Sequence, residues 1–246
     1  MGVSDDVKER VASVLNTAWS TRDGRVVPST SDVALSNGAV EVEAAFLYAD
    51  LAGSTALQKD YKATFAAKAI RMYLAGASQI IRHFGGQIRS FDGDRVMGVF
   101  VGNSKRNDAV KAAFMINWLV REVINPLVRE RQQNMKNTTV WVARHGVGID
   151  VGATFIARAG VRNSSGAQTH NDLIFTGRAP NIAAKLSALR DENLGPIVIT
   201  EDVFGGLNPE QKKYEKSDKK VWSGPSVHAI GPYSLSLHHT NYWRHP

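Results

Sequence analysis

Apolar positions recur along this chain at two spacings, one typical of helices and the other of strands. Spacings of three and four residues predict an amphipathic helix from Ser4 to about Trp19, a long helix from Gly53 to about His83, and a second long helix from Asn107 to about Arg131. Shorter apolar runs predict strands at residues 40–48, 87–91, 96–101, 138–151, 153–159, 173–175 and 197–200, with another helix at 180–189. The Ser- and Pro-containing stretch 21–37 lacks periodicity and is predicted to be a loop.

The order of these elements predicts the fold. Asp92-Gly93-Asp94 between two apolar runs is a strong hairpin signal, so the chain reads strand, helix, hairpin, helix, strand, with additions. This βαββαβ order is typical of a ferredoxin-like palm, an α+β fold in which helices pack on one face of an antiparallel sheet. We expect an N-terminal helix and arm at residues 1–40, a main domain at 41–205 and a C-terminal extension of that domain at 206–246.

Composition narrows the class of protein. No apolar run reaches the roughly 20 residues of a membrane span, and the first residues lack a signal peptide, so we expect a cytoplasmic protein without a membrane partner. The absence of cysteine excludes disulfides and thiolate metal sites. The net charge of +7 would attract a polyanion. However, acidic residues interrupt the lysine-rich run at 212–220, which favours a solvated surface over a nucleic-acid partner.

Two carboxylates are predicted to meet at one end of the sheet. Asp50 follows the first strand and Asp94 lies at the tip of the neighbouring hairpin. Carboxylate oxygens suit Mg²⁺ and Mn²⁺, and phosphoryl transfer to a hydroxyl uses two such ions about 3.5–4 Å apart. The backbone N–H groups of Gly53-Ser54-Thr55, at the start of the next helix, suit a triphosphate. Taken singly, Asp50 is more simply interpreted as a helix cap and Asp94 as a turn residue.

The two aspartates belong to a series of three sequence motifs. An aromatic-x-Asp followed by Gly-Ser-Thr stands at Tyr48 to Thr55, and a hairpin Gly-Asp at Gly93-Asp94. The third, Gly-x-x-x-Asn-x-Ala-x-Arg, is matched at residues 177–185, with lysine in place of the final arginine. These motifs resemble those of the class III adenylate and guanylate cyclases, and the likeness covers about residues 41–205.

That resemblance implies a homodimer in which each active site draws on both subunits. It implies that Asp50 and Asp94 bind two divalent metal ions, Mg²⁺ or Mn²⁺, with the Leu51 carbonyl as an extra ligand. Asn181 of the other subunit would position the ribose, and Lys185 would neutralise charge on the phosphates in place of the family's arginine. A lysine offers a point charge without the planar fork of arginine, and this position also reads as an exposed helix lysine. Asn181 and Lys185 are one helical turn apart and should share a face.

The base-reading positions depart from the purine cyclases of this family. Where adenylate cyclases have a Lys and an Asp or Thr, this chain has Ser90 and Ile174, and the Glu and Cys pair of guanylate cyclases is absent as well. Tyr48 should point to the same side of its strand as Asp50 and narrow the pocket, and Arg95 could donate to a pyrimidine carbonyl. Tyr48 also reads as a core tyrosine and Arg95 as a surface cation.

These features resemble the uridylate cyclases of bacterial Pycsar anti-phage systems. The likeness implies conversion of UTP to 3′,5′-cyclic UMP and pyrophosphate, with a separate effector that responds to the cyclic nucleotide. Two alternatives stay open: an adenylate or cytidylate cyclase with an unusual base pocket, and a catalytically inactive nucleotide- or RNA-binding module of the same fold. The second is disfavoured because metal-free Asp50 and Asp94 would repel phosphate.

Overall fold

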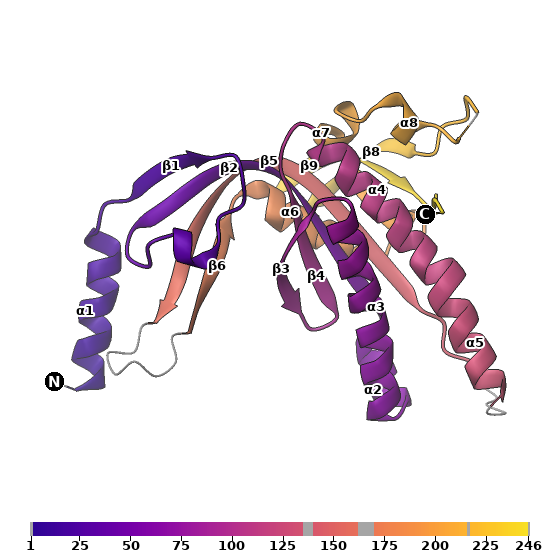
Figure 1. The fold of residues 1–246 in the computed structure, drawn as a ribbon, viewed down its shortest axis with the longest axis horizontal. Coiled ribbons are helices and arrows are strands. Elements are labelled where there is room, and N and C mark those ends of the chain that lie inside the picture. The colour runs from indigo at the N-terminus through magenta and orange to yellow at the C-terminus, as the bar shows by residue number, and fades with distance from the viewer. Residues whose placement is uncertain (1, 135–139, 162–169, 216, 246) are drawn as a thin grey trace. The chain divides into compact units, whose positions relative to one another are not determined.

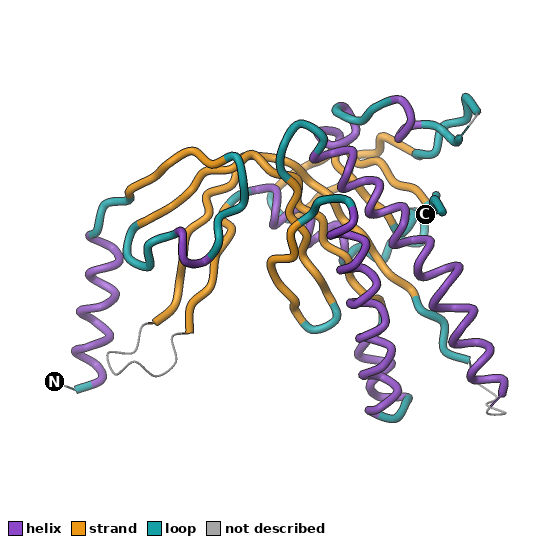
Figure 2. Tube along the Cα trace, in the orientation of Figure 1, coloured by secondary structure: helices purple, strands orange, loops and turns teal. Residues whose placement is uncertain are grey.

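The structure is a computed structural model, and it describes residues 2–134, 140–161, 170–215 and 217–245. The α-helices are α1 (Val3–Asn16), α2 (Ser54–Asp60), α3 (Ala63–His83), α4 (Lys105–Trp118), α5 (Asn125–Asn134), α6 (Arg178–Ser187), α7 (Glu201–Gly205) and α8 (Pro209–Lys212). The strands are β1 (Ser20–Gly24), β2 (Gly38–Ala52), β3 (Gln87–Asp92), β4 (Arg95–Phe100), β5 (Arg144–Val161), β6 (His170–Thr176), β7 (Ile197–Thr200), β8 (Ser223–Ile230) and β9 (Tyr233–Thr240) (Figures 1 and 2).

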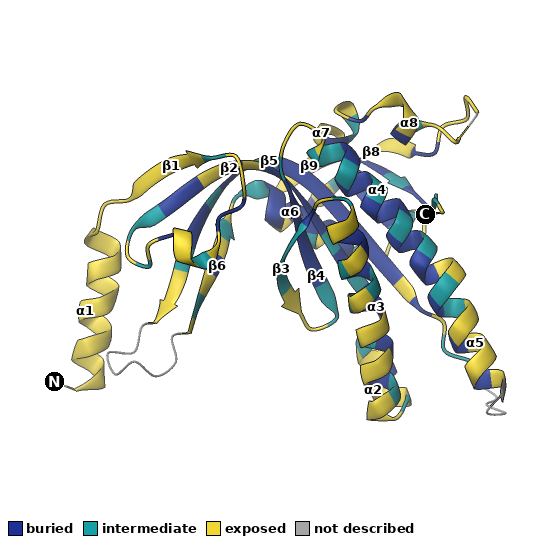
Figure 3. Cartoon of the chain, viewed as in Figure 1, coloured by how far each residue is buried: buried dark blue, intermediate teal, exposed yellow. Residues whose placement is uncertain are grey.

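The chain divides into two compact units. The smaller comprises Met1–Glu43 and Ala153–Arg178, and the larger comprises Ala44–Gly152 and Ala179–Pro246. In the smaller unit, β1 pairs in parallel with the start of β2, and β6 pairs antiparallel with the end of β5. The Trp19 ring packs edge-on against Phe155, with centroids 5.1 Å apart. Figure 3 shows α1 as exposed along its length.

The larger unit contains a sheet with the strand order β3-β4-β2-β5-β7-β9-β8. The β3–β4 hairpin and the β2–β4 pair are antiparallel, whereas β5 and β7 run parallel, so the sheet is mixed. The predicted fold class is confirmed as α+β, and the parallel pairing of β5 with β7 makes the sheet mixed where an antiparallel one was predicted. The region after residue 205 completes the sheet with the β8–β9 hairpin, which the sequence left unassigned.

Helices cover both faces of this sheet. Alternate residues of β5 point to opposite faces. Val147 and Ile149 join the main core, together with Tyr73 of α3 and Phe114 of α4. Gly146 and Gly148 point to the other face, toward α6. A Cβ at Gly148 would lie 2.2 Å from the Ala183 carbonyl oxygen. The prediction of helices on one face was therefore wrong, because glycines in β5 let α6 pack closely on the other face.

Several predicted elements differ from the observed ones. The helix predicted to run from Gly53 to His83 is two helices, because Tyr61 and Lys62 have extended backbones between α2 and α3. The strands predicted on either side of Gly152 form the single strand β5. The stretch predicted to be a loop at 21–37 contains most of β1 and a 3-10 turn at Thr30–Asp32. The second long helix is continuous, with a π-helical turn at Leu119–Ile124 joining α4 to α5. The polar sequence at 162–171 also predicts a loop, and most of this stretch lies outside the described residues.

Candidate active site

The two predicted carboxylates lie together at one end of β2. Asp50 is opposite Arg95 in the pairing of β2 with β4, and Asp94 occupies the turn that joins β3 to β4. The Leu51 amide donates to the Asp94 carbonyl oxygen at 3.2 Å, which fixes the hairpin tip against the strand end. Burial raises the pKa of the Asp50 carboxyl, and the nearby negative charge of Asp94 raises it further. Two like charges held this close favour an added cation.

A cation from the protein itself already contacts this pair. The Arg190 Nη2 atom forms a short ion pair with the Asp50 carboxylate and opposes the rise in the pKa of that group. The Nη1 atom of Arg190 donates to the carbonyl oxygens of Ser187 at 2.7 Å and Leu189 at 2.8 Å. Arg190 follows the end of α6 by three residues, so the close packing of α6 on β5 brings its guanidinium to Asp50.

Two buried polar side chains stand near this ion pair. The Tyr73 hydroxyl and the His145 Nε2 atom are both buried without a hydrogen-bond partner among the described residues, and their ring centroids are 6.2 Å apart. Burial raises the pKa of Tyr73 well above its usual value, and the charges of Asp50 and Arg190 also act on it. Burial, with a smaller contribution from Arg190, lowers the pKa of His145 to about 3. His145 is therefore neutral at pH 7.

The predicted base-binding residues of the larger unit lie in two rows on the same face of the sheet. Met97 of β4 is opposite Tyr48 on one side and Ser90 on the other, so these three form one row. The next row on that face lies beyond the pair Ala49 and Val96, and it holds Asp50 and Arg95. The Arg95 guanidinium lies 5.3 Å from the centre of the Tyr48 ring and bonds Asp92 at 2.5 Å. Its Nε atom is buried without a partner in the described part of the chain. A guanidinium has five N–H donors, so the bond to Asp92 uses only part of them.

The other predicted site residues are placed as follows. Asn181 and Lys185 both lie on the exposed face of α6, as their spacing predicted. The Lys185 side chain extends to the β8–β9 turn, where its Nζ atom is 3.2 Å from the position a Cβ on Gly231 would take. Gly53 has a left-handed backbone, with φ of 75°, directly before α2. Ser54 and Thr55 begin that helix. Ile174 belongs to β6 of the smaller unit, opposite Ala157, and is 45% exposed.

The donor set is compatible with metal ions bound together with a nucleotide. Among the described residues, no group of three or more His, Cys, Asp or Glu side chains is placed to hold a metal ion. Two carboxylates suffice where substrate phosphates supply further oxygens, as is usual for Mg²⁺. The attraction of Asp50 for the Arg190 guanidinium shows that this position accepts a positive charge. Asp50, Asp94 and the Leu51 carbonyl therefore fit the predicted role.

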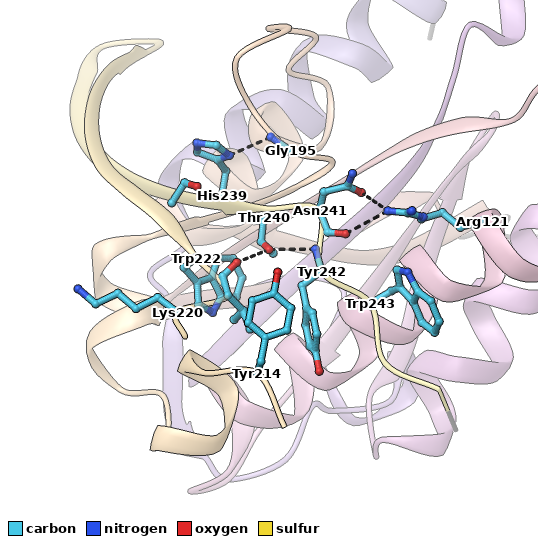
Figure 4. Close-up of a pocket in the computed structure, with 12 residues that line it drawn as sticks. Arg121, Gly195, Tyr214, Lys220, Trp222, His239, Thr240, Asn241, Tyr242 and Trp243 are labelled. Atoms are coloured by element: carbon cyan, nitrogen blue, oxygen red, sulfur yellow. Dashed lines mark hydrogen bonds between the residues drawn. The ribbon is translucent and has the colours of Figure 1, made fainter. Parts of the chain in front are cut away.

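The cavity drawn in Figure 4 is separate from these residues. It has a volume of about 690 Å³, and aromatic rings such as Tyr214, Trp222 and Tyr242 line it together with Arg121 and Lys220. Its polar contacts are internal, for example the hydrogen bond from the Arg121 Nη1 atom to the Asn241 side chain at 3.0 Å. None of its lining residues is a predicted site residue.

Comparison with solved structures identifies the fold. The adenylyl cyclase CyaB of P. aeruginosa matches with a TM-score of 0.62 and 17% identity, over 82% of this chain and 95% of that one. The guanylyl cyclase Cya2 matches with a TM-score of 0.64 and 15% identity, over 84% of this chain and 95% of that one. At these identities the likeness establishes the fold. The fold is that of the class III nucleotidyl cyclase catalytic domain.

Sequence comparison narrows the class to one family. The chain is 38% identical to a uridylate cyclase of Rhodovulum sp. (strain MB263), over 100% of this chain and 99% of that protein. It is 40% identical to a uridylate cyclase of Burkholderia cepacia, over 86% of this chain and 87% of that protein. No family model matches the chain. At this identity over its full length, the chain belongs to the uridylate cyclase family.

Three features of the site were missed from the sequence. Met97 could have been found, because its place in the hairpin puts it opposite Tyr48. The strand pattern also contained His145, as a lone imidazole at the start of an apolar run. Arg190 gave no local signal: its approach to Asp50, 140 residues earlier in the chain, depends on how α6 packs.

Proposed function

We propose that this chain cyclises UTP to 3′,5′-cyclic UMP with release of pyrophosphate. In this reaction the ribose 3′-oxygen attacks the α-phosphorus, the bond from that phosphorus to the bridging oxygen of the β-phosphate breaks, and the 3′-hydroxyl loses its proton. The single observation that carries the proposal is the family membership, supported by the position of Tyr48 and Arg95 beside the carboxylate pair.

Each residue has a distinct part in this proposal. Asp50, Asp94 and the Leu51 carbonyl hold two divalent ions, Mg²⁺ or Mn²⁺. These ions, when bound, polarise the 3′-hydroxyl and offset charge on the leaving pyrophosphate. The backbone at Gly53-Ser54-Thr55 binds phosphate oxygens through its N–H groups. Asn181 and Lys185, from the second subunit of a homodimer, position the ribose and neutralise phosphate charge.

Base selection follows from the two sheet rows beside the carboxylates. Tyr48 limits the depth of the pocket, so a second ring fits poorly. The Arg95 guanidinium has five N–H donors, so others remain for a uracil carbonyl while its Nη2 atom bonds Asp92. Cytosine replaces one carbonyl with an amino donor, which a cation disfavours. Ser90 stands where adenylate cyclases have a lysine, and the Ile174 side chain has no hydrogen-bonding group. Neither residue therefore makes the contacts with which those enzymes recognise a purine.

Turnover of each nucleotide by the purified protein tests the base assignment. With Mn²⁺ and equal concentrations of UTP, CTP, ATP and GTP, we expect cyclic UMP to dominate the products identified by mass spectrometry. Arg95→Ala should lower kcat/KM for UTP on the order of tenfold to a hundredfold and narrow the UTP to CTP ratio. Arg82→Ala, which removes the same charge from the exposed end of α3, should leave both unchanged. Faster consumption of ATP than of UTP would refute the pyrimidine assignment.

We further propose that cyclic UMP acts as a second messenger in anti-phage defence and that a separate effector binds it. This rests on the resemblance to the Pycsar cyclases. None of the described helices is long and apolar enough to cross a membrane. Infection of cells that express the protein with its neighbouring genes should raise cyclic UMP and protect the culture, and Asp94→Ala should abolish both effects. Protection without a rise in cyclic UMP would rule out the messenger role.

A further inference from the structure

The Arg190 guanidinium is held at the carboxylate site by a side-chain contact and by backbone contacts. One nitrogen of its guanidinium contacts Asp50, and the other donates to the carbonyl oxygens of Ser187 and Leu189. The anchoring nitrogen does not depend on Asp50, so the group keeps its place when the carboxylate takes another partner. The guanidinium has five N–H donors, which leaves donors for a further ligand.

The neighbouring strand leaves room for this guanidinium. A Cβ at Gly146 of β5 would lie 2.8 Å from the Arg190 Nη1 atom and 2.2 Å from the Ser187 carbonyl oxygen. Any larger residue would push the arginine and the end of α6 away from β5. His145, next in the strand, is neutral at pH 7 and adds no competing positive charge.

Open space adjoins the arginine. A cavity of about 420 Å³ is lined by Arg190, Ala52 and Arg144, and the acidic residues Asp191 and Glu192 line it as well. Ala52 stands directly before Gly53-Ser54-Thr55, the segment proposed to bind the triphosphate. The planar fork of arginine matches pairs of phosphate oxygens, which a lysine at the end of a flexible chain does not.

We propose that Arg190 binds the polyphosphate of the nucleotide, and that it rests on Asp50 only while no metal ion occupies that carboxylate. A divalent ion at Asp50 competes with the Nη2 atom of Arg190. The displaced guanidinium, still held by Ser187 and Leu189, turns to the phosphate oxygens. This inference rests on the proposed cyclase function and supplies the fork that Lys185 lacks.

Two binding measurements on Arg190→Gln test the proposal, because they should change in opposite directions. Titration calorimetry with Mn²⁺ alone should show tighter binding than in the wild type, by about threefold to tenfold, since the competing ion pair is lost. Titration of pyrophosphate at saturating Mn²⁺ should show weaker binding, on the order of tenfold to a hundredfold. Arg190→Lys should recover part of the pyrophosphate affinity.

Arg106→Gln is the matched control. Arg106 also donates to a backbone carbonyl, that of Asp202 at 3.1 Å, and lies against a glycine, Gly206. Both affinities should stay at the wild-type value in this variant. Weaker binding of both Mn²⁺ and pyrophosphate by Arg190→Gln would show a merely structural role, and unchanged pyrophosphate binding would overturn the proposal. If the opposite shifts appear in a protein that makes no cyclic nucleotide, the proposed function fails while this inference stands.

Discussion

Asp50 and Asp94 are the proposed metal ligands, and they differ in their burial and their contacts. Asp50 is half-buried and paired with Arg190, so its removal leaves a guanidinium without its partner. Asp94 lies at a hairpin tip, where its charge raises the pKa of Asp50. Asp94 is therefore the cleaner position for a mutation that separates catalysis from folding.

Asp94→Ala should abolish most cyclisation while the fold is kept. We expect kcat/KM to fall at least on the order of a hundredfold to a thousandfold, because the variant loses a proposed metal ligand at the place where charge develops. The melting temperature should stay the same or rise slightly, since a like charge near Asp50 is gone. Asp60→Ala, at the exposed end of α2, is the control. Near-normal turnover by Asp94→Ala at low Mn²⁺ would exclude the two-metal assignment.

His145 should make the protein less stable in acid. Its pKa of about 3 in the folded state lies below the unfolded value of 6.5, so the unfolded chain binds more protons between these values. The contribution of His145 to the free energy of unfolding should therefore be fully present above pH 6.5. Below that pH it should decrease by about 1.4 kcal/mol for each pH unit. His145→Gln should lack this part of the slope. Denaturant unfolding at pH 7, 6 and 5 measures the difference, and parallel curves for the two proteins would contradict it.

At the residue scale, the sequence predicted what local motifs specify. The carboxylate pair and the face shared by Asn181 and Lys185 follow from strand or helix spacing. Arg190 could not be predicted in this way. Its partner is distant in the chain, and its approach depends on a glycine, Gly146, whose role is to leave space.

At the scale of elements, the contact between α6 and β5 places much of the site. Glycines at 146 and 148 bring the helix backbone against the strand, and Arg190 follows the end of that helix. Periodicity predicted both α6 and the strand residues of β5 but gave no sign of their distance. The break between α2 and α3 was missed for a similar reason: Tyr61 is held by packing, with its ring 5.2 Å from that of Phe65.

Gly148→Ala should loosen this contact. The added Cβ would lie 2.2 Å from the Ala183 carbonyl oxygen and 2.4 Å from the Ser187 amide nitrogen, both backbone atoms that cannot move aside alone. We expect a loss of about 1 to 3 kcal/mol in stability, measured by denaturant unfolding. Gly152→Ala is a matched control in the same strand, because its Cβ would meet only the Ala179 Cβ, at 3.7 Å. Equal losses in the two variants would show that the close approach is not the cause.

At the scale of the whole molecule, the order of elements predicted the fold class because the strands and helices of the main domain have a clear period. The mixed sheet was not predictable, since the parallel pairing of β5 with β7 depends on the path through α6. Nor was the β8–β9 hairpin, whose exposed and buried residues alternate irregularly. The predicted homodimer belongs to this scale as well, because it assigns Asn181 and Lys185 to the subunit opposite Asp50.

Mixing two inactive variants tests that assembly. Asp50→Ala and Asn181→Ala chains, each inactive alone, should regain activity when their subunits exchange, because a heterodimer then has one site with both lesions and one site with neither. With equal amounts and random exchange, half of the dimers are mixed and each has one working site, so about a quarter of wild-type activity is expected. Lys185→Ala can replace Asn181→Ala as an independent second lesion, and two preparations of Asp50→Ala mixed together are the negative control. If subunit exchange is demonstrated by a labelled chain and no activity returns, each site must instead be formed within a single chain.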